Sequence, residues 1–268
     1  MSSRYTHGHH EAVLRSHRWR TAENSAAYLL PHLRSGLDLL DVGCGPGTLT
    51  CDLADRIAPG AAVGLDASAE VVAEAEAEAR RRGTPNVTFV AGDVYALDAP
   101  DDRYDVVHAH QVLQHLTDPV AALAELRRVV RPDGVVAVRD SDYAAFTWAP
   151  GDPRLTRWLD LYHQVTQINR AEADAGRHLP GWARAAGFTD VEVGSSTWTF
   201  AAPEDRAWWG GLWADRVGLA DSALAAQALD HGLTTPEELA DLAQGFRDWA
   251  AAEDGVFVVL HVEVLARG

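Results

Sequence analysis

The chain has 268 residues, of which 39 are acidic and 23 basic, and its formal net charge is −16 at pH 7. This balance excludes a basic surface for nucleic acid, and no apolar run approaches the ~20 residues of a membrane span. Every basic side chain is arginine, which excludes chemistry that depends on a phosphate-binding or Schiff-base lysine.

The first half of the chain alternates strand-like and helix-like segments. Residues 11–33 predict a helical region that is interrupted near Thr21 and stops near Pro31. Strands are then expected at 37–42, 61–65, 86–91, 104–109 and 135–139, with helices at 47–58, 68–82 and 118–130. Ser68 and Gly83 are typical of a helix start and stop. This alternation predicts a parallel sheet with helices on both faces.

The second half is less regular. Residues 153–186 are expected to be mainly helical, with a loop around 176–180. Strands are expected at 191–200 and 256–266. Between them, residues 203–252 predict helices and are rich in tryptophan.

A glycine-rich turn follows the first expected strand. Residues 39–48 read Leu-Leu-Asp-Val-Gly-Cys-Gly-Pro-Gly-Thr, so that Gly43, Gly45 and Gly47 alternate with other residues. Glycines permit a tight turn and the close approach of a ligand, so a nucleotide-bearing cofactor is expected here. The dinucleotide fingerprint needs a small third residue where this chain has Thr48. The turn therefore favours an adenosine ligand without phosphates.

The turn and several later segments resemble the class I S-adenosylmethionine-dependent methyltransferases, especially the ubiquinone/menaquinone-biosynthesis-like group. The matching later segments are 63–66, 91–94, 104–107 with 112–116, and 129–134, and the resemblance covers residues 30–145. It implies a Rossmann-like sheet of seven mostly parallel strands with helices on both faces. It also implies S-adenosylmethionine as cofactor and S-adenosylhomocysteine as product.

In the resembling family the last two strands are near neighbours, so the helical residues between them here are expected to form a cap. The whole chain, 1–268, is then one methyltransferase domain. Its expected parts are an N-terminal helical lid at 1–36, a cofactor-binding core at 37–145, a completion of the core at 146–200, a helical cap insertion at 201–253 and the last strand at 254–268.

Acidic residues at strand ends are candidates for cofactor contacts. Asp66 suits the ribose diol, since a carboxylate can accept two hydrogen bonds, although it could instead cap a helix. Asp93 suits the exocyclic amine of adenine, with the Val94 amide beside it, although it could be a turn aspartate. Asp41 could order the glycine turn through backbone amides or lie near the methionine amine.

Other residues complete the expected cofactor site. Arg20 is a candidate for the methionine carboxylate, against the alternative of a solvated helix arginine. Residues 109–111 should pass the sulfonium with their carbonyls facing it, and His115 should line the pocket or pack against a helix. The full expected set is Arg20, Asp41, Gly43, Cys44, Gly45, Gly47, Asp66, Ala67, Gly92, Asp93, Val94, Ala109, His110, Gln111 and His115.

Methyl transfer from a sulfonium is an in-line displacement that proximity and alignment can accelerate. A base is needed only if the acceptor must lose a proton. Candidate groups follow the fourth and fifth strands, namely His108, His110, His115, Asp140, Asp142 and Tyr143. We favour His110 and Asp142 as catalytic residues and include His115. A set of loop polar groups without a catalytic role is the alternative.

The remaining features bear on ligands and location. His7, His9 and His10 lack the spacing of a metal site, so no metal is expected. The aromatic segment 198–213 suits a partly apolar small-molecule acceptor, although cap core is the alternative. Two cysteines, Cys44 and Cys51, give no disulfide framework and favour the cytoplasm.

The sequence thus predicts methyl transfer to oxygen, nitrogen or carbon of a small molecule, with no nucleic acid or membrane span and with a homodimer left open. An NAD(P)-dependent reductase on a similar sheet is one alternative. A non-catalytic S-adenosylmethionine-binding protein is the other.

Overall fold

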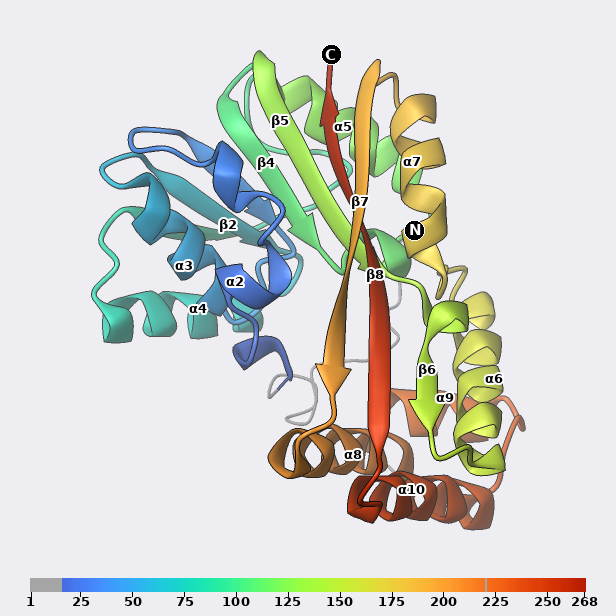
Figure 1. Cartoon of the computed structure of the whole chain (residues 1–268). Coiled ribbons are helices and arrows are strands. Elements are labelled where there is room, and N and C mark those ends of the chain that lie inside the picture. Colours follow the sequence, from blue (N-terminus) through green and yellow to red (C-terminus); the bar gives the residue numbers. More distant parts are fainter. Residues whose placement is uncertain (1–15, 220) are drawn as a thin grey trace.

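The computed structural model describes residues 16–219 and 221–268, which form a twisted sheet, flanking helices and a helical cluster at one end (Figure 1). The strands are β1 (Leu39–Val42), β2 (Ala62–Asp66), β3 (Val87–Ala91), β4 (Tyr104–His110), β5 (Val130–Ser141), β6 (Thr147–Ala149), β7 (Asp190–Phe200) and β8 (Val256–Arg267). The α-helices are α2 (Ala22–Ser25), α3 (Thr48–Ile57), α4 (Ala69–Arg82), α5 (Pro119–Val129), α6 (Pro153–Ile168), α7 (Ala175–Ala185), α8 (Pro203–Gly218), α9 (Ala223–Asp230) and α10 (Pro236–Ala251). Short 3-10 helices are η1 (Leu30–His32), η2 (Leu113–His115) and η3 (Tyr143–Ala145).

The strands form one sheet in the order β3-β2-β1-β4-β5-β8-β6, and β7 also pairs with β8. Strands β1 to β5 pair in parallel, whereas β8 runs antiparallel to β5, β6 and β7. The strand order reverses between β1 and β4. In open α/β sheets ligands bind beyond the carboxyl ends of the strands at such a reversal.

The apolar runs of the sequence form the central strands because both faces of the sheet are covered. All four residues of β1 are buried. Leu39 belongs to the apolar cluster under α3, and its neighbour Leu40 belongs to the cluster under α5, as the two-residue period of a strand requires. The mixed α/β fold class predicted from the sequence is confirmed.

A third apolar cluster joins α6, α8, α9 and α10 to the ends of β6, β7 and β8. Its centre is aromatic, with the ring of Trp158 5.1 Å from that of Phe246 and 4.5 Å from that of Trp213. Helices α8 and α10 lie together below the lower ends of β7 and β8 (Figure 1). The helices between the last two strands therefore pack as a unit against this end of the sheet.

Two local expectations were wrong. The expected loop at 176–180 is helical, because α7 runs through it and buries Leu179 and Ala183 against the sheet, and the break between helices lies at 169–174 instead. The burial of apolar side chains stabilises the helix here more than Gly176 and Pro180 disfavour it. Strand β5 begins at Val130 rather than 135, since Val130 pairs with Tyr104 and a register shift follows.

The expected interruption near Thr21 is present, because residues 16–18 are helical and Thr21 caps the next helix, the four-residue α2. The region is less helical than expected between α2 and η1, where residues 26–29 form a bend and turns. Residues 11–15 of the expected helix lie outside the described residues. The sheet has one strand more than expected, the short β6. Its three residues are too few to show the alternation of apolar and polar residues that predicts a strand.

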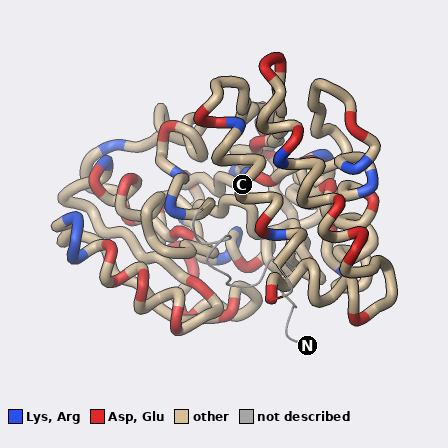
Figure 2. The backbone as a smooth tube through the Cα atoms, turned by 90° about the horizontal axis from the view of Figure 1, so that it is seen from below, with Lys and Arg blue, Asp and Glu red and all other residues tan. Residues whose placement is uncertain are grey.

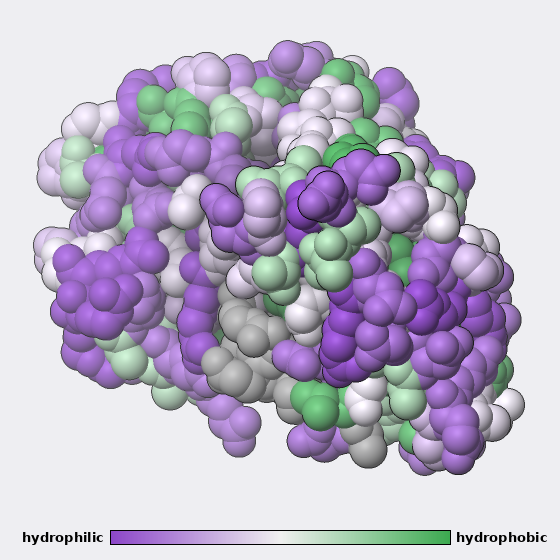
Figure 3. Space-filling view, turned by 60° about the horizontal axis from the view of Figure 1, so that its bottom comes forward, coloured by the Kyte–Doolittle hydropathy of each residue, from purple (hydrophilic) through white to green (hydrophobic). Residues whose placement is uncertain are grey.

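Acidic residues are spread along the helices and loops, with arginines among them (Figure 2). Arg82, for example, pairs with Asp52 and Glu78. The face turned forward in Figure 3 is largely hydrophilic, with scattered apolar spots. None of the described helices is long and apolar enough to cross a membrane.

Candidate active site

The turn between β1 and α3 takes a shape that requires glycine. Gly43, Gly45 and Gly47 have φ angles of +69°, +55° and +80°, which side chains disfavour. A Cβ on Gly43 would lie 2.3 Å from Val112 Cγ2, and one on Gly47 would lie 2.9 Å from Ala75 Cβ. At Gly45 the nearest atom would be a ring nitrogen of His17 at 3.6 Å. Side chains thus pack closely against Gly43 and Gly47, whereas the side of the turn at Gly45 is less crowded.

Asp41 holds the base of this turn. Its carboxylate accepts a hydrogen bond from the Thr50 hydroxyl at 2.5 Å, and its other oxygen lies 2.7 Å from His108 Nδ1. Only 2 % of Asp41 is exposed. Side chains of α3 and β4, rather than the expected backbone amides, are therefore its partners.

Asp66 and Asp93 lie at or just beyond the carboxyl ends of the neighbouring strands β2 and β3. Asp66 accepts hydrogen bonds from the Gly45 amide at 3.1 Å and from the Ser68 amide at 3.0 Å, so it supports both the turn and the start of α4. Asp93 is exposed and accepts one from the Tyr95 amide at 2.9 Å, which is the geometry of a turn aspartate.

A pocket lies over the glycine turn and encloses about 290 Å³, including space open to solvent. Its described lining residues are His17, Arg20, Asp41, Gly43, Cys44, Gly45, Pro46, Thr48, Leu49 and His110. We call it the turn pocket. It brings together five of the residues predicted for the cofactor site besides His110, and Asp41 is the one carboxylate among its described lining residues.

A second pocket of about 470 Å³, also partly open to solvent, adjoins the first. Its described lining residues are Ser16, His17, Trp19, Arg20, Gln111, His115, Ser141, Tyr143, Phe146, Trp198, Trp208, Trp209, Trp213, Arg216 and Val259. We call it the aromatic pocket. His17 and Arg20 line both pockets, so the two spaces are neighbours.

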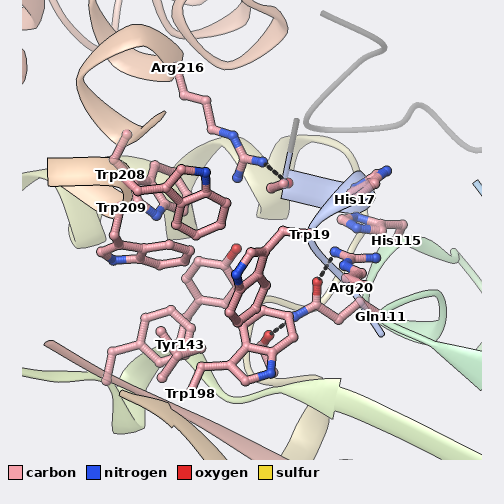
Figure 4. Close-up of a pocket in the computed structure, with 15 residues that line it drawn as sticks. His17, Trp19, Arg20, Gln111, His115, Tyr143, Trp198, Trp208, Trp209 and Arg216 are labelled. Carbon is pink, nitrogen blue, oxygen red and sulfur yellow. Dashed lines mark hydrogen bonds between the residues drawn. The ribbon is translucent and has the colours of Figure 1, made fainter. Parts of the chain in front are cut away.

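Trp19 occupies the middle of the aromatic pocket (Figure 4). Its ring centroid is 5.1 Å from that of Trp198 and 5.1 Å from that of Trp208. Trp209 stacks on Phe200 at 4.3 Å behind them. The flat apolar faces of these rings thus surround the indole ring of Trp19.

The segment that carries Trp19 crosses over both pockets. The Thr48 hydroxyl donates to the His17 carbonyl at 3.2 Å, and Trp198 Nε1 donates to the Asn24 carbonyl at 2.6 Å. At the other end, Arg216 donates to the Ser16 hydroxyl at 2.6 Å. Residues 16–24 are therefore attached to α3, β7 and α8.

Gln111 lines the aromatic pocket and contacts Arg20, which lines both pockets. Its φ of +55° follows the end of β4. Arg20 donates to its side-chain oxygen, and its amide nitrogen lies 2.8 Å from both Ser141 Oγ and His261 Nε2. Gln111 was predicted for its backbone, but its side chain carries these contacts.

Comparison with known proteins supports one family. Residues 33–188 match the model of a methyltransferase domain family. An uncharacterized methyltransferase of Schizosaccharomyces pombe is 35% identical over 221 residues, which cover 80% of this chain and 79% of that protein. The chain belongs to the methyltransferase family.

Two further relatives extend the comparison. Nocamycin O-methyltransferase of Saccharothrix syringae is 32% identical over 195 residues, covering 68% of this chain and 70% of that enzyme. A phosphoethanolamine N-methyltransferase of Haemonchus contortus, solved with S-adenosylhomocysteine, has the same fold, with a TM-score of 0.60 at 15% identity and with 96% of this chain and 57% of that chain covered. This chain is a class I S-adenosylmethionine-dependent methyltransferase, and the reductase alternative is not favoured.

The two histidines predicted to act in this methyltransferase are buried and neutral. Burial lowers the pKa of His110 well below its usual value, and Arg20 and Arg139 lower it further. Burial, with Arg20 and Arg216, lowers the pKa of His115 to about 3. His110 lines the turn pocket, and its Nε2 has no hydrogen-bond partner among the described residues.

The acids at the end of β5, Asp140 within the strand and Asp142 just after it, do not line either pocket. Both oxygens of Asp142 accept hydrogen bonds from Arg177, at 2.7 and 2.5 Å, and Asp142 lines neither pocket. Asp140 is fully buried, and burial raises its pKa to about 8. The structure therefore brings His110 and His115 to the site but turns Asp142 toward α7.

The other predicted residues vary in placement. Ala109 is buried in β4 and Val94 is buried after β3, whereas Ala67 is exposed. A Cβ on Gly92 would lie 2.9 Å from Leu65. Burial raises the pKa of the Cys44 thiol, which keeps it protonated. No described group of residues has the arrangement of a metal site, and His7, His9 and His10 lie outside the described residues.

Sequence reasoning did not single out three residues that the fold brings to this region. His261 comes from β8, Trp198 from β7 and Arg216 from α8. Trp198 was considered only as part of an aromatic segment. Their placement depends on the pairing of β7 with β8, which no local pattern reveals.

Proposed function

We propose that this enzyme moves a methyl group from S-adenosylmethionine at the turn pocket to a small, partly apolar molecule in the aromatic pocket. The observation that carries the proposal is the shared wall of the two pockets, His17 and Arg20. Molecules on either side of this wall would be neighbours, as an in-line displacement requires.

The turn pocket and the strand ends beside it suit the cofactor's polar groups. Asp66 and Asp93 do not line the turn pocket, but they follow the neighbouring strands, where Asp66 would accept from the ribose diol and Asp93 from the adenine amine. Arg20 would pair with the methionine carboxylate, while Asp41 lies near enough to the turn to favour the ammonium. The open space above Gly45 would let the cofactor approach the backbone closely. The bound cofactor supplies an activated methyl group on its sulfonium.

The chain's own residues would align the acceptor and exclude water. Tryptophan and tyrosine faces would hold an apolar body, and Gln111, Ser141 and Arg20 offer polar contacts on the side of the turn pocket. His110 and His115 stay candidates for contact with the reacting groups, and Asp142 would act only if it left Arg177. Methylation on oxygen, nitrogen or carbon and a homodimer stay predictions.

The cofactor assignment is tested by replacing Asp66 with alanine. We expect S-adenosylhomocysteine affinity, measured by titration calorimetry, to fall about 10- to 100-fold, because charge-assisted hydrogen bonds are lost. Asp98→Ala, at an exposed site, is the matched control and should bind as the original protein does. Equal affinity in both variants, or tighter binding of NAD than of S-adenosylhomocysteine, would contradict the assignment.

Transfer itself is tested with a metabolite extract and S-adenosylmethionine, followed by mass spectrometry for products heavier by one CH₂ group. Products that depend on the enzyme support the proposal. Tight cofactor binding without any product would favour the non-catalytic alternative.

A further inference from the structure

We propose that the acceptor is an oxygen acid on a flat conjugated scaffold, such as a phenol, an enol or an aromatic carboxylic acid, that binds as its anion and is methylated on that oxygen. The inference rests on the proposed acceptor role of the aromatic pocket. It adds the charge, the shape and the reacting atom of the acceptor.

The shape follows from the walls. Trp198, Trp208 and Trp209 present their rings around one space, and the indole of Trp19 already lies within it (Figure 4). The Trp19 ring is perpendicular to Trp198 and tilted by 34° to Trp208. Such edge-to-face and offset arrangements are those that aromatic rings prefer. A space that accommodates one flat bicyclic ring suits another.

The charge follows from the lining. Arg20 and Arg216 line the aromatic pocket, and none of its described lining residues is acidic. The whole chain has 39 acidic and 23 basic residues, so the charge of this pocket lining is opposite in sign to the net charge of the molecule. The turn pocket differs, because it contains Asp41. The acceptor side therefore favours negative charge, while the cofactor side retains a carboxylate for a positive ligand.

An amine is the main competitor, since aromatic walls also attract cations. Here arginines already occupy these faces. The Arg216 guanidinium lies 5.0 Å from the ring centre of Trp213, and that of the buried Arg139 lies 5.0 Å from the ring centre of Trp198. Arg139 is paired with Glu263 at 3.2 Å, but an ammonium group near Trp213 would meet the like charge of Arg216, and methylation of a neutral amine would create such a cation.

The ionisable residues of the pocket respond to the same positive field. After burial, Arg20 and Arg216 are what lowers the pKa of His115 to about 3. Burial raises the pKa of Tyr143, and Arg216 and Arg20 lessen that rise. An acceptor hydroxyl beside them would ionise more easily than at an equally buried site without the arginines. His115 cannot keep a proton at neutral pH, so the acceptor loses its proton to solvent before reaction.

The reaction is then balanced without a protein base. A lone pair of the acceptor oxyanion forms the O–CH₃ bond while the S–CH₃ bond breaks. The electron pair of the broken bond stays on sulfur, which gives neutral S-adenosylhomocysteine and the methyl ether or ester. Arg216 stabilises the anion in the aromatic pocket, while the charge of Arg20 is shared with the methionine carboxylate of the cofactor.

Three isosteric probes test the charge preference, namely 2-naphthoate, 2-naphthamide and 2-naphthylmethylammonium. Each is titrated into the full chain saturated with S-adenosylhomocysteine, with tryptophan fluorescence as the readout. We expect naphthoate to bind about 10-fold more tightly than the amide, since one charge-assisted contact is worth about that factor. The ammonium probe should bind most weakly. Equal affinities, a preference for the ammonium, or no binding of any probe would overturn the inference.

Variants locate the effect. Arg216→Gln should abolish most of the preference for naphthoate over the amide while amide binding persists, and Arg216→Lys should restore part of it. The control is Arg80→Gln, at an exposed helix position remote from the pocket, which should keep the full preference. An unchanged preference in Arg216→Gln would contradict the assignment of this site.

A separate readout distinguishes the two proposals. The same samples are first titrated with S-adenosylhomocysteine. If it does not bind, the proposed function fails. If it binds but the charge preference is absent or reversed, only the acceptor class fails.

Discussion

Asp140 is an acid kept neutral by its surroundings. It ends its strand with none of its surface exposed, and the Gln114 amide donates to one of its oxygens at 3.3 Å, while the other has no partner among the described residues. Burial raises its pKa to about 8. In the unfolded chain the same group would ionise near its usual value of about 3.9. Between these values only the folded state retains the proton.

The sign of the pH effect follows. Since the folded state binds more protons, the contribution of Asp140 to stability is present below about pH 4 and is lost as the pH rises toward 8. We expect the free energy of unfolding of the original protein to fall, relative to Asp140→Asn, by up to about 1.4 kcal/mol per pH unit between pH 5 and 7. Urea unfolding of both proteins at these pH values measures it. Parallel pH profiles would show that Asp140 is ionised in the fold.

At the scale of elements, residues of the segment 16–24 line both pockets, so we expect this segment to affect how fast the cofactor enters and leaves the turn pocket. Thr48→Val removes the hydroxyl that donates to the His17 carbonyl while keeping the shape of the side chain. The loss of one neutral hydrogen bond should speed the dissociation of S-adenosylhomocysteine about 2- to 10-fold, measured by stopped-flow fluorescence. Thr88→Val, at an exposed position of β3, is the control. An unchanged rate would mean that this attachment does not limit release.

The elements also show what a sequence can and cannot reveal. The β1–α3 turn was predictable because the three glycines act locally, each through its own backbone. The helical course of α7 was not, since burial of Leu179 decides it. The aromatic pocket was still less accessible, because its walls come from segments as distant as Trp19 and Arg216. The pairing of β7 with β8 brings Trp198 and His261 together, and this pairing has no local signature.

The molecule as a whole carries a formal net charge of −16, and its acidic residues are spread over the whole backbone (Figure 2). Repulsion among these charges opposes the compact state, and salt screens it, with a Debye length of about 8 Å at 0.15 M. We therefore expect the melting temperature to rise by a few degrees, about 2–4 °C for each kcal/mol gained, as NaCl is raised from 10 mM to about 0.15 M. Differential scanning calorimetry measures this change. A fall would show that the surface ion pairs outweigh the repulsion.

The position of β8 has a consequence for how the molecule assembles during synthesis. Strands β1 to β5 are contiguous in the chain apart from their helices, so this half of the sheet can form early on the ribosome. Strand β8 follows α10, yet it pairs with β5, β6 and β7. A nascent chain halted within α10 would thus have its cofactor turn in place, with β7 still exposed as an edge for wrong partners.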